Sequence, residues 1–387
     1  MVKRRTAISG SKDVITAAKE RIAYLFDNYD NIQLSFSGGK DSTCLFHLLN
    51  AEAKKRNRKF YVYFQDQEAE YQGTIDMVKW AMSQQNVIPL WYQVPIFMTN
   101  ACSQEQLFLW AWGENENWVR EKDSLSIHHI DEKYPKRFYK FNDWVGRKLA
   151  KLPGKSVSVI GLRAEESPDR RMVMFGEDNS LFWMRRKKNP NRAYPIIDWS
   201  FTDVWKFLID NKLKYNVVYD KMYMLGVPLR QMRVSNLIHE KAYRCLTELQ
   251  ELEPETYNKL ELRLKGVHCA SIYAKERLVY SIKKLPPQFK TWKEYKDFLL
   301  DNMHPDLAKI FRFKWTRFGD TDDVLVCKYM VKRLLLCDWE GNVHEPNWNI
   351  KHPEWDYNHY NYTKEQLKEK RHAQKYDEDI RKWYDQF

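Results

Sequence analysis

The sequence predicts an α/β protein, in which a parallel, twisted sheet flanked by helices is followed by a mainly helical C-terminal region. Over residues 13–220, short apolar runs alternate with segments of helical periodicity, as in proteins built from parallel strands and right-handed crossovers. A turn of small residues at 37–39 joins the first run to a helix. From about residue 230 the pattern is mainly helical and has no repeats.

The elements follow one another in a regular order. Apolar side chains between Val14 and Phe26 predict an amphipathic helix over 13–28. Alternation of apolar and polar residues at 32–36 predicts a strand, and leucines at helical spacing predict a helix that begins at Lys40. Further strands are expected at 60–64, 87–94 and 157–160, and a further helix at 74–85.

At 387 residues, the chain is long enough for two domains. We expect an α/β domain over 1–225, with an aromatic-rich insertion at about 96–150, and a mainly helical domain over 226–387. The helices expected in the second domain lie at 236–250, 272–283 and 291–301. The charged tail at 363–387 is expected to be a helix with a solvated face, or else a docking arm.

Composition narrows the class of protein and the compartment. The formal net charge of +12 favours anionic partners, and both nucleic acid and nucleotides fit that description. The six cysteines show no metal-binding spacing and are expected to stay reduced in a cytoplasm. The N-terminus has no apolar signal-peptide core, and no run of 18 apolar residues occurs, so no membrane association is expected.

The turn at 37–39 has the composition of an anion site. Glycines let a phosphate approach the backbone, free N–H groups at a helix start attract negative charge, and serine hydroxyls at 37 and 42 add donors. Lys40 supplies a mobile positive charge. The Walker pattern is excluded, because the spacer is too short and Asp41 follows the lysine. The alternative is a glycine turn before a core helix.

Two further blocks carry charge or caps. In VIGLRAEESPDRR (159–171), Arg163 follows a strand and can bind two phosphate oxygens, whereas Glu165 and Glu166 either bind a hydrated metal or order the arginines. The alternative is a surface loop whose charges pair with one another. In YPIIDWSFTDVW (194–205), Ser200 or Thr202 is expected to cap a helix. We expect the loop, Asp66 and the segment after Gly161 to meet at the carboxyl edge of the sheet.

The run SFSGGKDS resembles the PP-loop of the ATP pyrophosphatase superfamily. With GLRAEESPDRR and YPIIDWSFTDVWKFL in that order, residues 30–220 resemble the phosphoadenosine phosphosulfate reductase family. The nearest branch of that family includes proteins similar to immunoglobulin-binding regulator A, labelled phosphoadenosine phosphosulfate sulfurtransferases. The resemblance implies an adenine nucleotide α-hydrolase-like fold and a nucleotide-binding role for the domain at 1–225.

The resemblance also implies roles for individual residues. The catalytic candidates are Lys40, Asp41 and Arg163, and Mg²⁺ is expected at Asp41 and Glu165. The residues expected to bind ATP or phosphoadenosine phosphosulfate are Phe36, Ser37, Gly38, Gly39, Lys40, Asp41, Ser42, Asp66, Arg163 and Arg170.

Three departures from the family argue against a reductase. The chain ends KWYDQF, without the Glu-Cys-Gly-Leu-His tail that carries the reductase nucleophile. No cysteine pair follows Tyr219, so no iron–sulfur cluster is expected. Asp66 stands in QDQEAE, where reductases commonly have Asp-Thr-Gly. Cys269 has His268 as its neighbour, but adjacent helical residues do not face each other.

Three functions therefore stay open. The first is an enzyme that binds ATP or a sulfonucleotide with Mg²⁺ and cleaves at the α-phosphate, so as to adenylylate or sulfur-activate an acceptor. Its partner would be nucleic acid or a protein that supplies sulfur or the acceptor. The second is a nucleotide-binding regulator that acts through a partner protein. The third, a phosphoadenosine phosphosulfate reductase or sulfurtransferase, is disfavoured by the missing tail cysteine.

Overall fold

A computed structural model of the chain describes residues 13–336, except residues 101, 104–107, 173–180, 186–189, 230, 235, 239–244, 274–283 and 304. The chain divides into two compact units. The first comprises Met1–Met98, Trp110–Leu237 and Glu248–Lys259, and the second Thr99–Leu109, Ile238–Thr247 and Leu260–Phe387. The domain boundary expected between residues 225 and 226 stays a prediction.

The first unit is built on a six-stranded sheet of order β3-β2-β1-β6-β8-β7. The strands are β1 (Asn31–Ser35), β2 (Phe60–Gln65), β3 (Val87–Tyr92), β6 (Ser156–Ile160), β7 (Met184–Arg185) and β8 (Asn191–Ala193). All neighbours are parallel except β7 and β8, which pair antiparallel at one edge. The predicted class, a parallel sheet with helices, is confirmed.

The central strand β1 is buried between two neighbouring strands. Its Leu34 lies opposite Val62 of β2 on one side and Val159 of β6 on the other. All three side chains are fully buried in one hydrophobic core, as expected of strands that helices cover on both faces.

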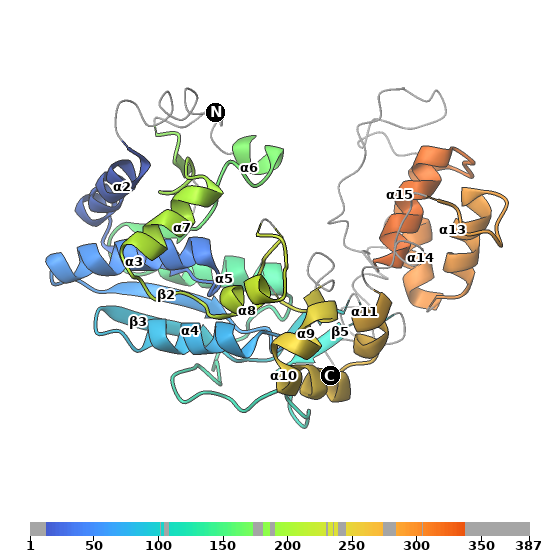
Figure 1. Cartoon of the computed structure of the whole chain (residues 1–387), viewed down its shortest axis with the longest axis horizontal. Helices are drawn as coiled ribbons and strands as arrows, with labels where there is room; N and C mark the ends of the chain where they lie inside the picture. The colour runs from blue at the N-terminus through green and yellow to red at the C-terminus, as the bar shows by residue number, and fades with distance from the viewer. Residues whose placement is uncertain are drawn as a thin grey trace. The chain divides into compact units, whose positions relative to one another are not determined.

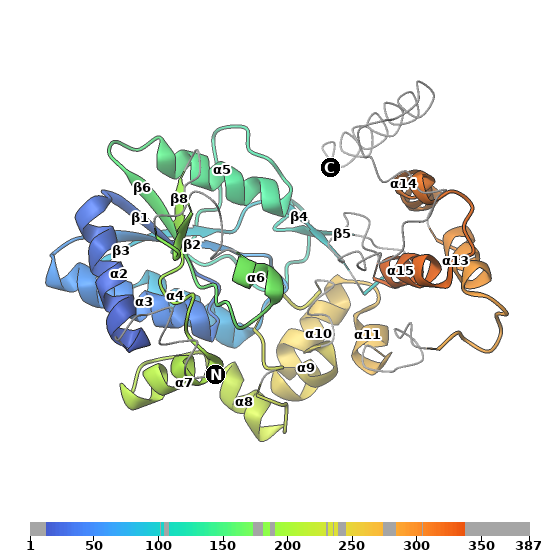
Figure 2. The same ribbon diagram turned by 90° about the horizontal axis from the view of Figure 1, so that it is seen from above.

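Helices cover both faces of this sheet (Figures 1 and 2). On one face, α3 and α4 pack together, with the rings of Phe46 and Trp80 5.2 Å apart. On the other face lies α5, whose Phe141 ring is 5.2 Å from that of Tyr92. The helices of this unit are α2 (Val14–Asn28), α3 (Lys40–Lys55), α4 (Gln72–Met82), α5 (Phe138–Ala150), α6 (Pro168–Met172), α7 (Phe201–Asp210) and α8 (Val218–Met224).

The topology gives the segment after β1 a special position. The chain passes from β1 to β2 on one side, whereas β6 flanks β1 on the other. The strand order therefore reverses at β1. In open parallel sheets, ligands bind at the carboxyl ends of the strands at such a reversal. Residues 37–39, between β1 and α3, lie at this point.

The aromatic-rich insertion contains a two-stranded sheet, β4 (Ile96–Thr99) with β5 (Phe108–Ala111), and α5. The acidic segment after β2 anchors it. Glu68 accepts hydrogen bonds from the backbone N–H groups of Trp112 (3.0 Å) and Val119 (3.1 Å). Arg120 pairs with Asp66 and also donates to the Glu68 carbonyl oxygen (2.6 Å). These buried carboxylates therefore tie the insertion to the sheet.

The described part of the chain from Leu246 onward is mainly helical, whereas the prediction placed the start of this region at about residue 230 and the described residues of 226–238 form turns and loops. Its elements are α9 (Leu246–Leu252), α10 (Pro254–Arg263), α11 (Val267–Tyr273), α13 (Trp292–Asp301), α14 (Pro305–Lys314), the 3-10 helix η3 (Thr316–Phe318) and α15 (Val324–Leu335). In the second unit, α13, α14 and α15 enclose a core that includes Leu300, Phe311 and Met330. No described helix is both long and apolar enough to cross a membrane.

Several predicted boundaries differ from the observed ones: α4 spans Gln72–Met82 rather than 74–85, and β3 ends at Tyr92 rather than at residue 94. Residues 236–238 are not helical where a helix was predicted from 236, because the Leu237 N–H is held by the Ala69 carbonyl oxygen (2.9 Å). Residues 274–283 of a second predicted helix, and the tail at 363–387, lie outside the described residues. The helix predicted at 291–301 corresponds to α13, which Thr291 caps.

Candidate functional site

The turn between β1 and α3 has a backbone that only glycine adopts easily. Gly38 has φ +66°, in the left-handed region. A Cβ atom at this position would lie 2.9 Å from Cγ2 of Thr74 on α4, closer than carbon atoms normally approach. Conformation and space both require glycine here.

Hydrogen bonds of the Ser37 and Ser42 hydroxyls join the turn to the first turn of α3. Ser42 Oγ accepts from the Ser37 N–H (3.3 Å), lies 3.1 Å from Ser37 Oγ and donates to the Gly39 carbonyl oxygen (3.0 Å). The N-cap position of α3 is Gly39, which has no side chain to satisfy the first N–H groups. The start of α3 thus combines the positive end of a helix with small, polar residues, an arrangement suited to an anion.

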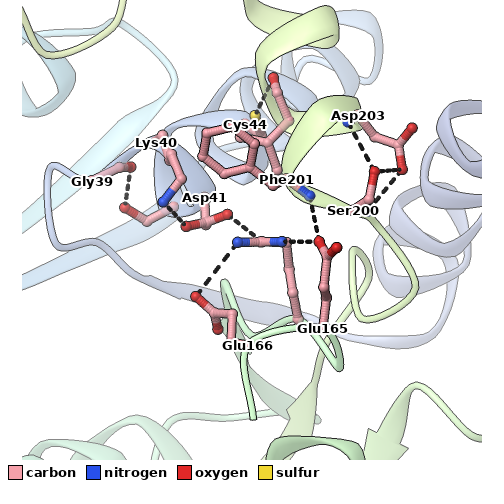
Figure 3. Close-up of polar contacts among 12 residues, drawn as sticks. Gly39, Lys40, Asp41, Cys44, Glu165, Glu166, Ser200, Phe201 and Asp203 are labelled. Atoms are coloured by element: carbon pink, nitrogen blue, oxygen red, sulfur yellow. Dashed lines mark hydrogen bonds and ion pairs between the residues drawn. The ribbon is translucent and has the colours of Figure 1, made fainter. Parts of the chain in front are cut away.

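Asp41 stands between the two predicted cations of the site (Figure 3). Its Oδ1 accepts from Arg163 Nε at 2.6 Å, and its Oδ2 accepts from Lys40 Nζ at 3.1 Å. Arg163 and Lys40 are both buried. Lys40 Nζ also lies 5.9 Å from the centre of the Phe201 ring and 5.8 Å from that of Tyr219. The structure brings together the three residues predicted to be catalytic.

Arg163 is held by more than Asp41. Its guanidinium contacts Glu165 (3.2 Å) and Glu166 (3.7 Å), so that three carboxylates converge on it (Figure 3). Glu165 also accepts from the Phe201 N–H (2.6 Å) at the start of α7. A Cβ on Gly161 would lie 3.0 Å from the backbone nitrogen of Ser42. The end of β6 therefore packs directly on the start of α3, which places Arg163 beside Asp41.

The remaining predicted ligands lie in different surroundings. The Arg170 side chain on α6 is 46% exposed and pairs with Glu166. Desolvation of its remaining part, and then the charge of Arg233, lower its pKa from the ordinary value. Phe36 is buried and its ring packs on that of Phe46 (5.6 Å). Contact of these residues with a nucleotide stays a prediction.

Asp66 lies at the carboxyl edge of the sheet, as the end of β2 requires, but its carboxylate is fully buried. It accepts from Trp91 Nε1 and Gln93 Nε2, both at 3.0 Å, and pairs with Arg120. The structure thus assigns this side chain to the support of the insertion. Its predicted contact with a nucleotide stays a prediction.

Among the described residues, no group of three or more His, Cys, Asp or Glu side chains could hold a metal ion. The two carboxylates predicted to hold Mg²⁺, those of Asp41 and Glu165, both contact Arg163. Oxygen donors of this kind suit Mg²⁺ when phosphate groups and water complete its coordination. The residues therefore fit an ion that arrives with a nucleotide.

The described cysteines offer no activated thiol beside the loop. Cys44 lies on α3, where burial, and then the charge of Asp41, raise its pKa well above the ordinary value. Burial also raises the pKa of Cys102 to about 12. Thiolates are the nucleophilic form of cysteine, so neither residue is suited to attack a sulfonucleotide.

The sequence did not indicate four residues that support the loop. Asn216 Nδ2 donates to the Gly38 carbonyl oxygen (3.3 Å), and Tyr219 accepts from the Lys40 N–H (3.1 Å). Thr74 packs against Gly38, and Glu253 accepts from two N–H groups at the start of α4. Asn216 and Tyr219 stand in a segment from which no site residue was predicted. No local pattern indicates their contacts with a turn that precedes them by about 180 residues.

Comparisons with known proteins give the following similarities. The family model "Phosphoadenosine phosphosulfate reductase domain" matches residues 31–226, and a domain of unknown function, DUF3440, matches residues 226–318. The chain is 28% identical over 322 residues to the uncharacterized protein YbdN of Escherichia coli (strain K12), covering 78% of each chain.

Two further similarities are more limited. Adenosine 5'-phosphosulfate reductase of Geobacillus thermodenitrificans (strain NG80-2) is 33% identical over 72 residues, which is 19% of this chain and 28% of that protein. A crystal structure of phosphoadenylyl-sulfate reductase from Candida auris, in complex with phosphate, aligns with a TM-score of 0.34 at 12% identity. That alignment covers 57% of this chain and 88% of the other.

Proposed function

The chain belongs to the phosphoadenosine phosphosulfate reductase domain family, and on that premise we propose that its first unit binds an adenine nucleotide and cleaves it at the α-phosphate. The observation that carries this proposal is the glycine turn at the start of α3, with Lys40 and Arg163 beside it. Turn, helix start and cations occupy the crevice position of the sheet, where this fold class binds its ligands.

Each part of the site has a role in this proposal. Backbone N–H groups at the start of α3 and the hydroxyls of Ser37 and Ser42 hold the terminal phosphates. Lys40 and Arg163 neutralise the charge that develops as these phosphates separate. Arg170, which lies on α6, adds positive charge for a more distant phosphate or sulfate.

Mg²⁺ accompanies the nucleotide in this proposal, with Asp41 and Glu165 as its nearest carboxylates. When bound, it supplies further neutralisation of the phosphate charge. Both carboxylates are hard oxygen donors, and both would exchange part of their contact with Arg163 for this role.

The proposed reaction is a displacement at phosphorus. An oxygen atom of the acceptor forms a bond to the α-phosphorus, the bond from that phosphorus to the bridging oxygen breaks, and pyrophosphate leaves with the electron pair. An acceptor that is already an oxyanion needs no general base, so positioning and charge neutralisation suffice. The reaction also needs no cysteine, in keeping with the raised pKa of the Cys44 thiol.

The acceptor and the exact nucleotide belong to the same proposal. ATP is the nucleotide that this displacement requires, and phosphoadenosine phosphosulfate is the alternative ligand. The net charge of +12 favours an anionic acceptor, either a nucleic acid or sulfate.

Incubation of the protein with α-labelled ATP and Mg²⁺, in the presence and absence of sulfate or DNA, tests the proposal. Release of pyrophosphate with labelled adenylylated product supports it. The Lys40→Ala variant should bind ATP about tenfold to a hundredfold more weakly, since a buried, charged donor is lost.

Lys55→Ala is the matched control, because Lys55 lies at the exposed far end of α3. Unchanged ATP affinity in Lys40→Ala would contradict the phosphate site. Binding of ATP without turnover, over all acceptors tried, would instead favour a nucleotide-binding regulator.

A further inference from the structure

Two side chains, one just before α8 and one within it, form hydrogen bonds with the backbone of residues 38 and 40, in the turn between β1 and α3 and at the start of α3. We propose that Tyr219 and Asn216 are positioning residues, which keep residues 37–40 in the conformation that accepts phosphate groups. This inference rests on the proposed function for its purpose, but the ordering of the turn can be measured separately.

Tyr219 caps the start of α3 in place of a local side chain. Its hydroxyl oxygen accepts from the Lys40 N–H at 3.1 Å, and a Cβ on Gly39 would lie 3.4 Å from the same oxygen. The ring is buried and packs edge-on against Trp205, with their centres 5.3 Å apart. The packing of the ring therefore holds the hydroxyl next to the Lys40 N–H.

The chemistry of this cap suits an anion site. Helices are usually capped by Asp, Asn, Ser or Thr, and a carboxylate at this point would repel phosphate. Burial raises the pKa of Tyr219 well above its ordinary value, so its hydroxyl stays neutral. A neutral acceptor satisfies the Lys40 N–H and adds no negative charge beside the phosphates.

Asn216 fixes the residue that needs a positive φ. Its Nδ2 donates both to the Gly38 carbonyl oxygen (3.3 Å) and to Thr74 Oγ1 (2.9 Å), and its Oδ1 accepts from the Val218 N–H (3.0 Å). Asn216 is 1% exposed, so these contacts are not shared with bulk water. One amide thus joins the turn, α4 and the start of α8.

The start of α4 packs closely against this amide and against α8. A Cβ on Gly73 would lie 2.6 Å from Val218 Cγ2 and 3.1 Å from Asn216 Oδ1. Glu253 accepts from the N–H groups of Gln72 (2.6 Å) and Gly73 (3.0 Å), which fixes the first turn of α4. The support behind the phosphate turn is therefore continuous from Glu253 to Tyr219.

Tyr219→Phe removes only the hydroxyl, and Tyr215→Phe is its matched control. Tyr215 also packs edge-on against Trp205 (5.4 Å), but its hydroxyl donates to Asp220 (2.9 Å) rather than contacting the turn. Hydrogen exchange of a peptide that covers residues 36–45 should be faster in Tyr219→Phe than in the wild type, in the absence of ligand. Tyr215→Phe should leave this exchange unchanged.

Binding of inorganic pyrophosphate gives the second measurement. It should be roughly tenfold weaker in Tyr219→Phe, because the turn must be ordered at the cost of binding free energy. Asn216→Asp keeps the size of the side chain but loses two donated hydrogen bonds, and it should also weaken the binding of pyrophosphate. This variant replaces Tyr219→Phe if that protein does not fold.

Three outcomes separate the inference from the proposed function. Equal exchange of the peptide in both tyrosine variants and the wild type would overturn the inference. Tighter pyrophosphate binding by Tyr219→Phe would also overturn it, since the hydroxyl would then compete with phosphate for the Lys40 N–H. Failure of the wild type to bind pyrophosphate or ATP would overturn the proposed function, while the exchange data would still decide whether Tyr219 orders the turn.

Discussion

Asp41 and Arg163 lie 122 residues apart in the sequence, and Arg163 Nε donates to Asp41 Oδ1 at 2.6 Å. The other oxygen of the same carboxylate accepts from Lys40 Nζ. One negative charge therefore holds both of the buried cations that we propose to bind phosphate. A phosphate group that enters the site must compete with Asp41, unless Mg²⁺ attracts this carboxylate at the same time.

This competition leads to a prediction for Asp41→Asn, in which the side chain keeps its size and loses its charge. Pyrophosphate should bind about tenfold more tightly to this variant in the absence of Mg²⁺, because Lys40 loses its counter-ion and Arg163 loses one of three carboxylate partners. In the presence of Mg²⁺ the advantage should disappear, since the variant also lacks the carboxylate for the ion. Titration calorimetry with Mg²⁺, and again with a chelator, measures both effects.

Asp76→Asn is a suitable control, because Asp76 is exposed on α4 and accepts a hydrogen bond from Gln72. It should bind pyrophosphate as the wild type does under both conditions. Weaker binding by Asp41→Asn without Mg²⁺ would show that the carboxylate organises the cations for phosphate rather than competing with it.

Arg163→Lys tests the geometry of the guanidinium. Lysine keeps the charge but cannot contact Asp41, Glu165 and Glu166 together, as the planar guanidinium does. Binding of pyrophosphate should weaken at least about tenfold, as measured by calorimetry. Arg56→Lys changes an arginine that also pairs with two carboxylates, at the C-terminal end of α3, and should have no effect. Equal binding by both variants would show that charge alone matters at position 163.

Gly38→Ala separates backbone strain from steric contact. A φ of +66° costs a residue with a Cβ about 1–2 kcal/mol, and the contact with Thr74 Cγ2 adds to that cost. Gly226→Ala has the same strain (φ +76°) with no atom within 4 Å, so it should be less destabilising. Thr74→Ser removes Cγ2 and keeps Oγ1, so it should recover part of the loss in Gly38→Ala.

Chemical denaturation of Gly38→Ala, Gly226→Ala, Thr74→Ser and the double variant Gly38→Ala/Thr74→Ser measures these differences in the free energy of unfolding. Gly38→Ala and Gly226→Ala with the same loss of stability would show that the contact with Thr74 costs nothing. Binding of pyrophosphate should be lost in Gly38→Ala alone, since Gly226 does not contact the turn.

The parts of the fold that can be predicted from the sequence are those whose cause lies in neighbouring residues. The alternation at 32–36, the glycines of the turn and the leucine spacing after Lys40 are contiguous, and each predicts its own element. Ser200 was expected as one of two possible caps, and it forms a capping box with Asp203. Parallel order then placed Arg163 at the correct edge of the sheet, because strand ends share an edge.

The sequence could not predict contacts that join distant segments. Glu253 accepts from the start of α4 across 180 residues, and nothing near position 253 indicates that partner. Asp66 lies at the carboxyl edge of the sheet, as expected from the strand before it, but the sequence did not indicate that Trp91, Gln93 and Arg120 would contact its carboxylate. Both cases depend on which segments pack together, and that information lies in the tertiary fold.

Glu70 is buried in the segment after β2, and it leads to a prediction about the pH dependence of stability. Burial, and then the charge of Asp66, raise its pKa from 4.5 to about 8, against the opposing effects of Arg120 and a hydrogen bond with Asn236. Between about pH 5 and about pH 8 the folded state therefore keeps a proton that the unfolded state has lost. The free energy of unfolding must fall as the pH rises through this range, and it levels off above the folded pKa.

Glu70→Gln mimics the protonated side chain and cannot titrate, so its stability should fall less steeply over that range. The difference in slope from the wild type should reach at most about 1.4 kcal/mol per pH unit, the contribution of one proton. Denaturant unfolding at several pH values measures it. Glu255→Gln, an exposed position in the first turn of α10, should keep the wild-type slope. Parallel curves for the wild type and Glu70→Gln would show that Glu70 is ionised in the folded protein, with its charge balanced by Arg120.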